Sequence, residues 1–144
     1  MNTMINKVLS TRAGYGLTVV RLFVGIIFAA HGAQKLFGAF GGYGLDGTGQ
    51  FMTSLGLSPG YLMALLAGSA EFFGGLAQLF GVLVRPAAAA LAFAMLVAIF
   101  SVHIGNGLFM SNNGYEFALA LLAGTVAVMI EGAGRFSLDR LIAR

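Results

Sequence analysis

Long apolar stretches, separated by short segments rich in glycine, proline and charge, dominate this chain. Four stretches approach the length of a membrane helix, at about 14–36, 59–83, 86–104 and 115–130. A helix needs about 20 residues to cross a bilayer, and none of the four shows the alternating pattern of barrel strands. The pattern therefore predicts an all-α integral membrane four-helix bundle, with residues 1–144 forming a single transmembrane domain.

Residues at the predicted helix ends agree with these boundaries. Pro59 suits the first turn of the second span, and Pro86 marks a tight break between the second and third spans. Asn113 and Glu116 have the spacing of a capping box that opens the fourth span, and Gly132 ends it. The last three spans therefore have local boundary signals as well as a change in hydropathy.

Two short helices are predicted outside the spans. Six glycines between positions 38 and 49 disfavour a stable helix in the first half of the loop 38–58. The apolar residues within 51–57 suit a short interfacial helix or a cap over the bundle. Residues 137–142 predict a second short helix on the membrane surface, with Asp139 in its first turn.

Composition narrows the class of protein further. Hydrophobic residues make up 58% of the chain, charged residues 9%, and the mean hydropathy is +0.90, whereas about a quarter of residues in soluble domains are charged. The pI near 9.7 reflects cations that flank the apolar stretches, so no nucleic-acid partner is predicted. Because there is no cysteine, the chain itself contains neither a disulfide nor a thiol relay.

The distribution of cations predicts the orientation. Lys35 alone lies on one side of the predicted spans, and seven cations lie on the other: Lys7, Arg12, Arg21, Arg85, Arg135, Arg140 and Arg144. The positive-inside rule then places both termini in the cytoplasm. Lys7 and Arg12 before an apolar stretch resemble a signal peptide, but this stretch is too long and three more follow, so we expect a retained first span.

Small residues recur every four positions within the spans, for example at Gly25, Ala29 and Ala33. This spacing lets helix backbones approach closely in lipid. Packing within one bundle is the plain interpretation, and the contact surface of a homo-oligomer is the alternative.

Polar residues within the apolar stretches are the candidate functional residues, because ionisable groups in hydrocarbon are costly. His31 and Lys35 share one face of the first span with Arg21, and Glu71 lies at a similar depth in the second. With residues near the outer ends of other spans they form a predicted outer-half cluster: His31, Gln34, Lys35, Glu71, His103, Asn113 and Glu116. We predict Glu71 and His31 as proton-exchanging catalytic groups and the other five as ligand-binding groups.

Several members of this cluster also have a structural interpretation. An ion pair with Lys35 or His31 would explain Glu71 without a ligand. Glu116 fits a helix cap with Asn113, and His103 fits a solvated residue at the membrane interface. The sequence leaves both interpretations open.

Three further polar residues are predicted to be structural. Arg21 and Glu131 belong to the inner end, where they would pair or extend toward water, and Gln78 suits an interhelical hydrogen bond. The sequence contains no phosphate-binding loop, dinucleotide fingerprint or cysteine-based metal site, so no metal is predicted. Haem b held by two histidines on different spans is an option that no motif supports.

Several segments, in their order and spacing, resemble the DoxX family of small four-helix bacterial membrane proteins. They are Arg21–Gly25, His31–Gly38, Glu71–Gly75, Asn113–Glu116 and the tail segment Ser137–Arg140. The resemblance covers nearly the whole chain. It implies a multi-pass protein of the bacterial cytoplasmic (inner) membrane. Relatives are linked to quinone-dependent thiosulfate oxidation, quinone detoxification and oxidative-stress complexes, usually beside a partner protein.

Three functions are consistent with the cluster and this resemblance. In the first, the cluster binds a quinone head group, with His31 and Lys35 as donors, Glu71 as the proton-exchanging acid, and electrons from a partner oxidoreductase or a bound cofactor. In the second, the chain is a non-catalytic anchor or scaffold for a redox complex. In the third, it transports a small solute, although few polar residues of the inner half would complete a path.

Overall fold

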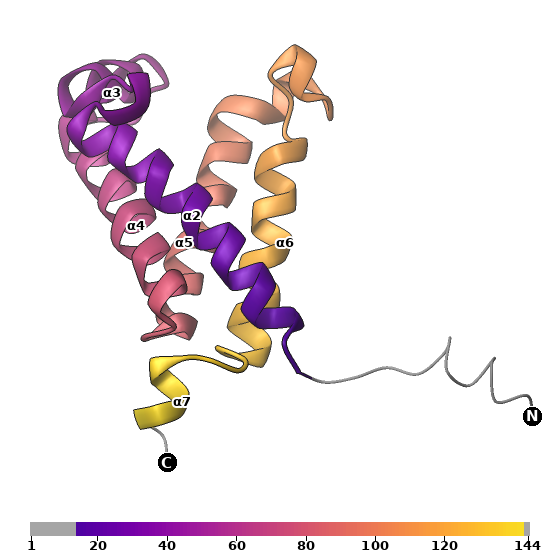
Figure 1. Cartoon of the computed structure of the whole chain (residues 1–144). Coiled ribbons are helices and arrows are strands. Elements are labelled where there is room, and N and C mark those ends of the chain that lie inside the picture. The colour runs from indigo at the N-terminus through magenta and orange to yellow at the C-terminus, as the bar shows by residue number, and fades with distance from the viewer. Residues whose placement is uncertain (1–13, 143–144) are drawn as a thin grey trace, which may run out of the picture.

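The computed structural model describes residues 14–142, and every regular element in this range is a helix, with no strand. Four long helices form its body: α2 (Gly16–Phe37), α4 (Gly60–Phe80), α5 (Val84–Ala98) and α6 (Glu116–Glu131). Helix α2 packs against α4 and α6, and α5 packs against the same two helices (Figure 1). The two ends of this bundle are named below after the short helices α3 and α7 that lie at them.

Three helices are long and apolar enough to cross a membrane: Gly16–Phe37, Gly60–Phe80 and Val84–Asn106. In the third, α5 continues through a π-helical turn, η2 (Ile99–His103), and a 3-10 turn, η3 (Ile104–Asn106). Helix α6 has 16 residues, which is short for a span of about 20. The first three predicted spans are therefore confirmed as helices of spanning length, and the fourth span stays a prediction.

Large apolar side chains cover the outward faces of the long helices. Phe23, Phe73 and Phe93 are 66%, 62% and 69% exposed. Extended apolar surface of this kind is disfavoured in water and is suited to contact with lipid. Three of the predicted orientation cations, Lys7, Arg12 and Arg144, lie outside the described residues.

The interior of the bundle is apolar at mid-depth. Phe28 of α2, Leu91 and Met95 of α5, and Leu121 of α6 are buried together in one cluster. A second, smaller cluster near the α7 end centres on Val84, Ala88 and Val128. The first of these clusters packs α2 against α5 and α6 at mid-depth.

Glycines bring α2 and α4 into backbone contact. A Cβ atom on Gly32 would lie 2.2 Å from the backbone nitrogen of Phe72, and one on Gly75 would lie 2.4 Å from that of Ala29. Only glycine fits at such distances, as in other closely packed membrane helices. Gly25 belongs to the predicted pattern, and a Cβ atom there would lie 2.9 Å from the carbonyl oxygen of Gly75. Packing within the bundle thus accounts for part of the small-residue pattern.

The glycine-rich loop contains a helix, so the expectation that its glycines disfavour one in the first half of the loop was wrong, while the short helix predicted within 51–57 is present as far as Ser54. Helix α3 (Gly44–Ser54) begins among the glycines and buries Thr48 and Gly49. A Cβ atom on Gly49 would lie 3.0 Å from Cα of Tyr61 at the start of α4. Packing on α4 stabilises a segment whose own propensity is poor, and tertiary contact commonly overrides propensity in this way.

The connection between α4 and α5 also differs from the prediction. Helix α4 ends at Phe80, Gly81 follows with a φ of 69°, and α5 already begins at Val84. Pro86 therefore lies in the first turn of α5, where its missing N–H loses no helical bond. The break is made by Gly81 and the two residues after it.

The end of α6 and the tail helix agree with the prediction. Helix α6 is followed by Gly132 at a φ of 91°, and the tail forms the short helix α7 (Leu138–Ile142). The hydroxyl of Ser137 accepts a hydrogen bond of 3.2 Å from the backbone N–H of Arg140. This contact caps α7 at its first turn.

Asp139 attaches the tail to the rest of the bundle. Its carboxylate accepts hydrogen bonds from the backbone N–H groups of Leu83, at 2.7 Å, and Val84, at 2.9 Å. Its own N–H donates to the carbonyl of Gly81 at 2.8 Å. Asp139 thus caps α5 across the chain, and α7 lies beneath the α4–α5 connection (Figure 1).

Candidate functional site

The centre of the site is an ion pair between α2 and α4. Lys35 Nζ lies 2.6 Å from Oε2 of Glu71, and the two side chains are 24% and 6% exposed. The pair depends on the close helix contact described above, because Gly32 lets α2 approach the backbone at Phe72. Lys35 follows Gly32 by about one helical turn and so lies beside Glu71.

His31 lies near this pair but does not bind Glu71. Its Nδ1 is 2.8 Å from the carbonyl oxygen of Ile27, one turn earlier on α2. A carbonyl only accepts hydrogen bonds, so Nδ1 carries a hydrogen and Nε2 is the ring nitrogen left free of this contact. The ring also lies 5.9 Å from that of Phe117 on α6, between centroids.

A backbone carbonyl orients the His103 ring, as another does for His31. It ends the π-helical turn η2, and its Nδ1 lies 2.9 Å from the carbonyl oxygen of Asn113. Asn106 donates to the same oxygen at 3.1 Å. Nδ1 of His103 therefore also carries a hydrogen, and Nε2 is the ring nitrogen left free of this contact. π-Helical turns of this kind occur often at functional sites.

These groups surround a pocket of about 310 Å³. Its polar wall consists of His31, Lys35, Glu71, His103 and Asn113. Its apolar and small lining residues come mainly from α2, α5 and α6: Phe28, Met95, Ala98, Met110, Gly114, Phe117, Ala118 and Leu121. We call this cavity the polar pocket.

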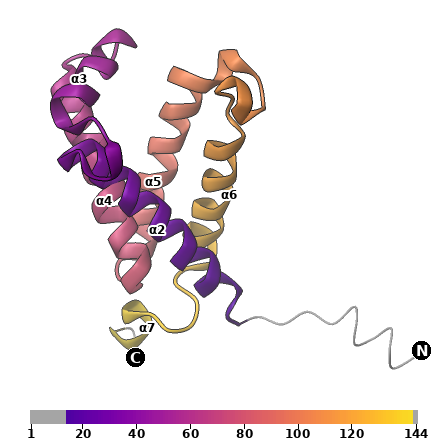
Figure 2. The same ribbon diagram turned by 45° about the horizontal axis from the view of Figure 1, so that its top comes forward.

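The polar pocket lies between two pairs of helices. Figures 1 and 2 both show α4 diverging from α5 and α6 toward the end that carries α3. The lining histidines, lysine and carboxylate come from that half of the bundle. The polar pocket thus lies in the half of the bundle that carries α3, next to the apolar cluster at mid-depth.

Two predicted members of the cluster do not line the pocket. Gln34 donates to the carbonyl of Phe40 at 3.3 Å, so it holds the turn after α2. Glu116 accepts a hydrogen bond of 2.9 Å from the backbone N–H of Met110. Both side chains therefore support the loops around the pocket.

The predicted capping box is not formed. Tyr115, and not Asn113, occupies the N-cap of α6, and no side chain caps that helix. Asn113 has a left-handed backbone with a φ of 57°, which places it in a turn before the helix. Its contribution to the site is the carbonyl that orients His103.

The predicted pair of Arg21 and Glu131 is also absent among the described residues. Arg21 is 1% exposed, and its Nη2 donates to the carbonyl of Phe136 at 2.9 Å. The tail folds back against α2 and supplies this acceptor, whereas Glu131 stays exposed. Gln78 is 1% exposed and donates to the carbonyl of Val84 at 3.1 Å, which joins α4 to α5.

Sequence reasoning missed the apolar side of the site. Phe28 precedes His31 by three residues and so shares its face of α2, and Phe117 follows Glu116 directly. Met95 and Met110 carry no such signal, because methionine is common in apolar segments. No group of three or more metal-ligating side chains is present in residues 14–142.

Comparison with known proteins assigns the chain to a family. The family model for DoxX matches residues 16–104, which include His31, Lys35, Glu71 and His103. The chain is 34% identical over 133 residues to inner membrane protein YqjF of Escherichia coli (strain K12), covering 88% of this chain and 92% of the relative. It is 32% identical over 127 residues to "Putative oxidoreductase CatD" of Bacillus subtilis (strain 168), covering 88% of this chain and 87% of the relative. No solved structure matches the chain. The chain belongs to the DoxX family of membrane proteins.

Proposed function

We propose that the polar pocket binds a quinone head group and that the protein is the membrane-bound subunit of a quinone-linked oxidoreductase. One observation carries the proposal: an ion pair and two oriented histidines border a 310 Å³ cavity whose remaining walls are mainly apolar. Such a mixture of apolar walls and few polar groups is typical of small-molecule sites. The name of the relative CatD supports an oxidoreductase context.

Lys35 is the proposed donor to a quinone carbonyl. An ammonium group has three N–H donors, and Glu71 accepts one of them. The remaining donors can bind a ligand oxygen while Glu71 retains the lysine in place. The flat ring would lie against Phe28 and Phe117, since aromatic rings pack favourably in offset or edge arrangements.

His31 is proposed to deliver a proton through Nε2. Because Nδ1 is bound to the Ile27 carbonyl, only Nε2 can gain or lose a proton toward the pocket. Reduction of a quinone to a quinol consumes two electrons and two protons. His31 Nε2 and the Glu71 carboxylate would each take up a proton from water and pass it to a quinone oxygen. The electrons come from a partner oxidoreductase or its bound cofactor.

Co-purification of a quinone tests this function. Wild-type protein in mild detergent is extracted with organic solvent and the quinones are quantified by mass spectrometry. We expect bound quinone in the wild type and at least a tenfold loss in Glu71→Gln and His31→Ala. Glu131→Gln, which changes an exposed carboxylate far from the pocket, is the matched control and should retain it.

The alternative is a scaffold that anchors a redox complex without binding a quinone. In that case the wild type would carry no quinone, and the same variants would still capture their partner in a pull-down. Transport is the weaker proposal, because Arg21 and Gln78 are buried at the α7 end and bind backbone carbonyls there. Proton or solute flux that depends on Glu71 in vesicles would favour it.

We also propose that α6 is the fourth span and that both termini are cytoplasmic. The α7 end carries Arg85, Arg135 and Arg140. Among residues 14–142, Lys35 is the one cation of the α3 end. This bias supports a cytoplasmic α7 end. The polar pocket would then open toward the outer side of the membrane.

A further inference from the structure

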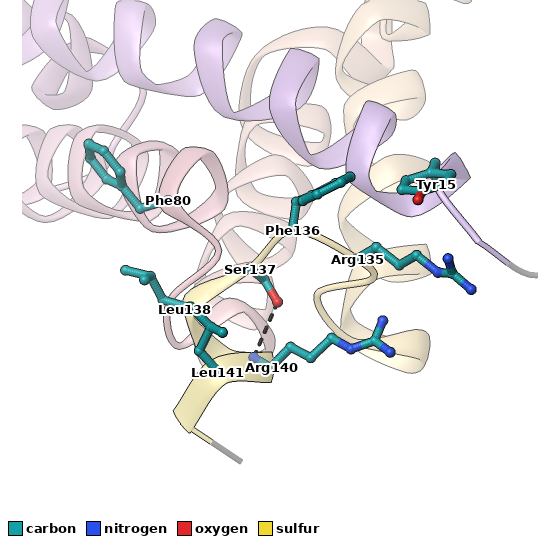
Figure 3. Close-up of a pocket in the computed structure, with 8 residues that line it drawn as sticks. All are labelled: Tyr15, Phe80, Arg135, Phe136, Ser137, Leu138, Arg140 and Leu141. Atoms are coloured by element: carbon teal, nitrogen blue, oxygen red, sulfur yellow. Dashed lines mark hydrogen bonds between the residues drawn. The ribbon is translucent and has the colours of Figure 1, made fainter. Parts of the chain in front are cut away.

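A second pocket lies at the opposite end of the molecule from the polar pocket. It has a volume of about 550 Å³ and is formed by the start of α2, the end of α4 and the tail. Figure 3 shows its lining residues. We call it the tail pocket. Its position at the charged end of an apolar bundle places it at the level of the membrane surface.

Two arginines supply the charge of the tail pocket. Arg135 and Arg140 both line it, and their guanidinium groups extend to the same side in Figure 3. None of the chain's five carboxylate side chains lines it. The nearest in sequence, Asp139, is bonded to the backbone of Leu83 and Val84 instead. The pocket is therefore a site of net positive charge.

Aromatic contacts hold one of these arginines in place. The guanidinium carbon of Arg135 lies 5.1 Å from the centroid of the Tyr15 ring. Tyr15 in turn stacks on Phe136, with centroids 5.4 Å apart. A cation held over an aromatic face loses less conformational freedom when it binds an anion. In residues 14–142 neither Arg135 nor Arg140 forms an ion pair.

The other side of the tail pocket is apolar and exposed. Phe80, Leu138 and Leu141 are 63%, 44% and 61% exposed, and in Figure 3 Phe80 and Leu138 lie opposite the guanidinium groups. A free anion would leave this apolar wall in contact with water. A molecule with an anionic head and an apolar body would cover both sides.

We propose that the tail pocket binds the phosphate of an anionic phospholipid, with an acyl chain along Phe80, Leu138 and Leu141. Guanidinium groups bind phosphate oxygens through paired charge-assisted hydrogen bonds. Basic pockets at membrane surfaces recognise anionic lipid head groups in this way. The bound lipid would fix the tail, and with it the cap that Asp139 provides to α5.

Native mass spectrometry of the full chain in detergent tests the proposal. The probes are phosphatidylglycerol, phosphatidylcholine and inorganic phosphate. We expect phosphatidylglycerol to remain bound in preference to phosphatidylcholine, and inorganic phosphate at millimolar concentration not to displace it. Arg135→Gln and Arg140→Gln should each weaken phosphatidylglycerol binding by about tenfold, since one charge-assisted bond is worth roughly that factor.

Arg85→Gln is the matched control. Arg85 is an exposed arginine of the same end that lies outside the tail pocket, so this variant should bind phosphatidylglycerol like the wild type. Equal loss in Arg85→Gln would show attraction by net charge alone and overturn the site. Displacement by inorganic phosphate, or equal retention of phosphatidylcholine, would overturn the lipid assignment. Each variant is first checked for a monodisperse elution profile, and the two single substitutions provide independent readings.

Discussion

Lys35 on α2 and Glu71 on α4 form an ion pair of 2.6 Å in which the carboxylate side chain is 6% exposed and the lysine 24%. This difference in exposure between the two side chains affects how much each contributes to the free energy of unfolding. A buried ion pair contributes little net free energy, but removal of one partner leaves an uncompensated charge. Lys35 is the more exposed partner and has room to move, whereas the Glu71 carboxylate stays buried.

Loss of Lys35 should therefore lower the free energy of unfolding more than loss of the charge on Glu71. We expect Lys35→Met to lower the free energy of unfolding by about 3 kcal/mol, because a buried carboxylate remains. Glu71→Gln should cost less than half as much, and the double variant should recover most of the loss caused by Lys35→Met. The measurement is unfolding in mixed detergent micelles, with Arg85→Met, an exposed cation, as the control. A double variant no more stable than Lys35→Met would contradict this account.

The second prediction concerns the contact between α2 and α4. In Gly32→Ala the new Cβ atom would lie 2.2 Å from the backbone nitrogen of Phe72, so the helices must separate. We expect a loss of about 1–3 kcal/mol or more, together with loss of any ligand of the polar pocket. Gly105→Ala is the control, because nothing lies within 4 Å of a Cβ atom there. Equal stability of the two variants would rule out the close approach.

The third prediction concerns the tail. Asp139→Ala removes two charge-assisted hydrogen bonds to the backbone of Leu83 and Val84, each worth about 1.5–3 kcal/mol. The tail should open at least about tenfold more often. Limited digestion with trypsin, which cuts after arginine, should then cleave after Arg135 and Arg140 correspondingly faster. Glu131→Ala should leave the cleavage rate unchanged, and equal rates in both variants would show that Asp139 does not hold the tail.

The sequence predicts the helices and the centre of the site for one physical reason. Ionisable groups in apolar helices must face other protein groups, so His31, Lys35 and Glu71 were expected on the inner faces. The structure brings them around one cavity, while their catalytic and binding roles stay predictions. The sequence of each helix was sufficient for this part, because the helical period alone determines which of its residues share a face.

The errors share a cause as well, since each concerns a contact that the sequence pattern of a single helix does not contain. Arg21 binds the carbonyl of Phe136, 115 residues away, and no local rule identifies a tail carbonyl as an acceptor. Asn113 and Glu116 match the capping box in spacing, but a turn anchored on Met110 gives Glu116 another donor. Helix α3 exists because it packs on α4, which helix propensity does not include.

The last prediction tests the orientation, which depends on the positive-inside rule. The chain has no cysteine, so a single introduced cysteine reports one position. Gly105→Cys lies at the exposed α3 end and Arg85→Cys at the exposed α7 end. A membrane-impermeant maleimide should label Gly105→Cys in intact spheroplasts, and should label Arg85→Cys only after the membrane is permeabilised. Both should react equally in detergent, which controls for local access. The reverse pattern would place the termini outside and open the polar pocket toward the cytoplasm, where a soluble reductase could reach it directly.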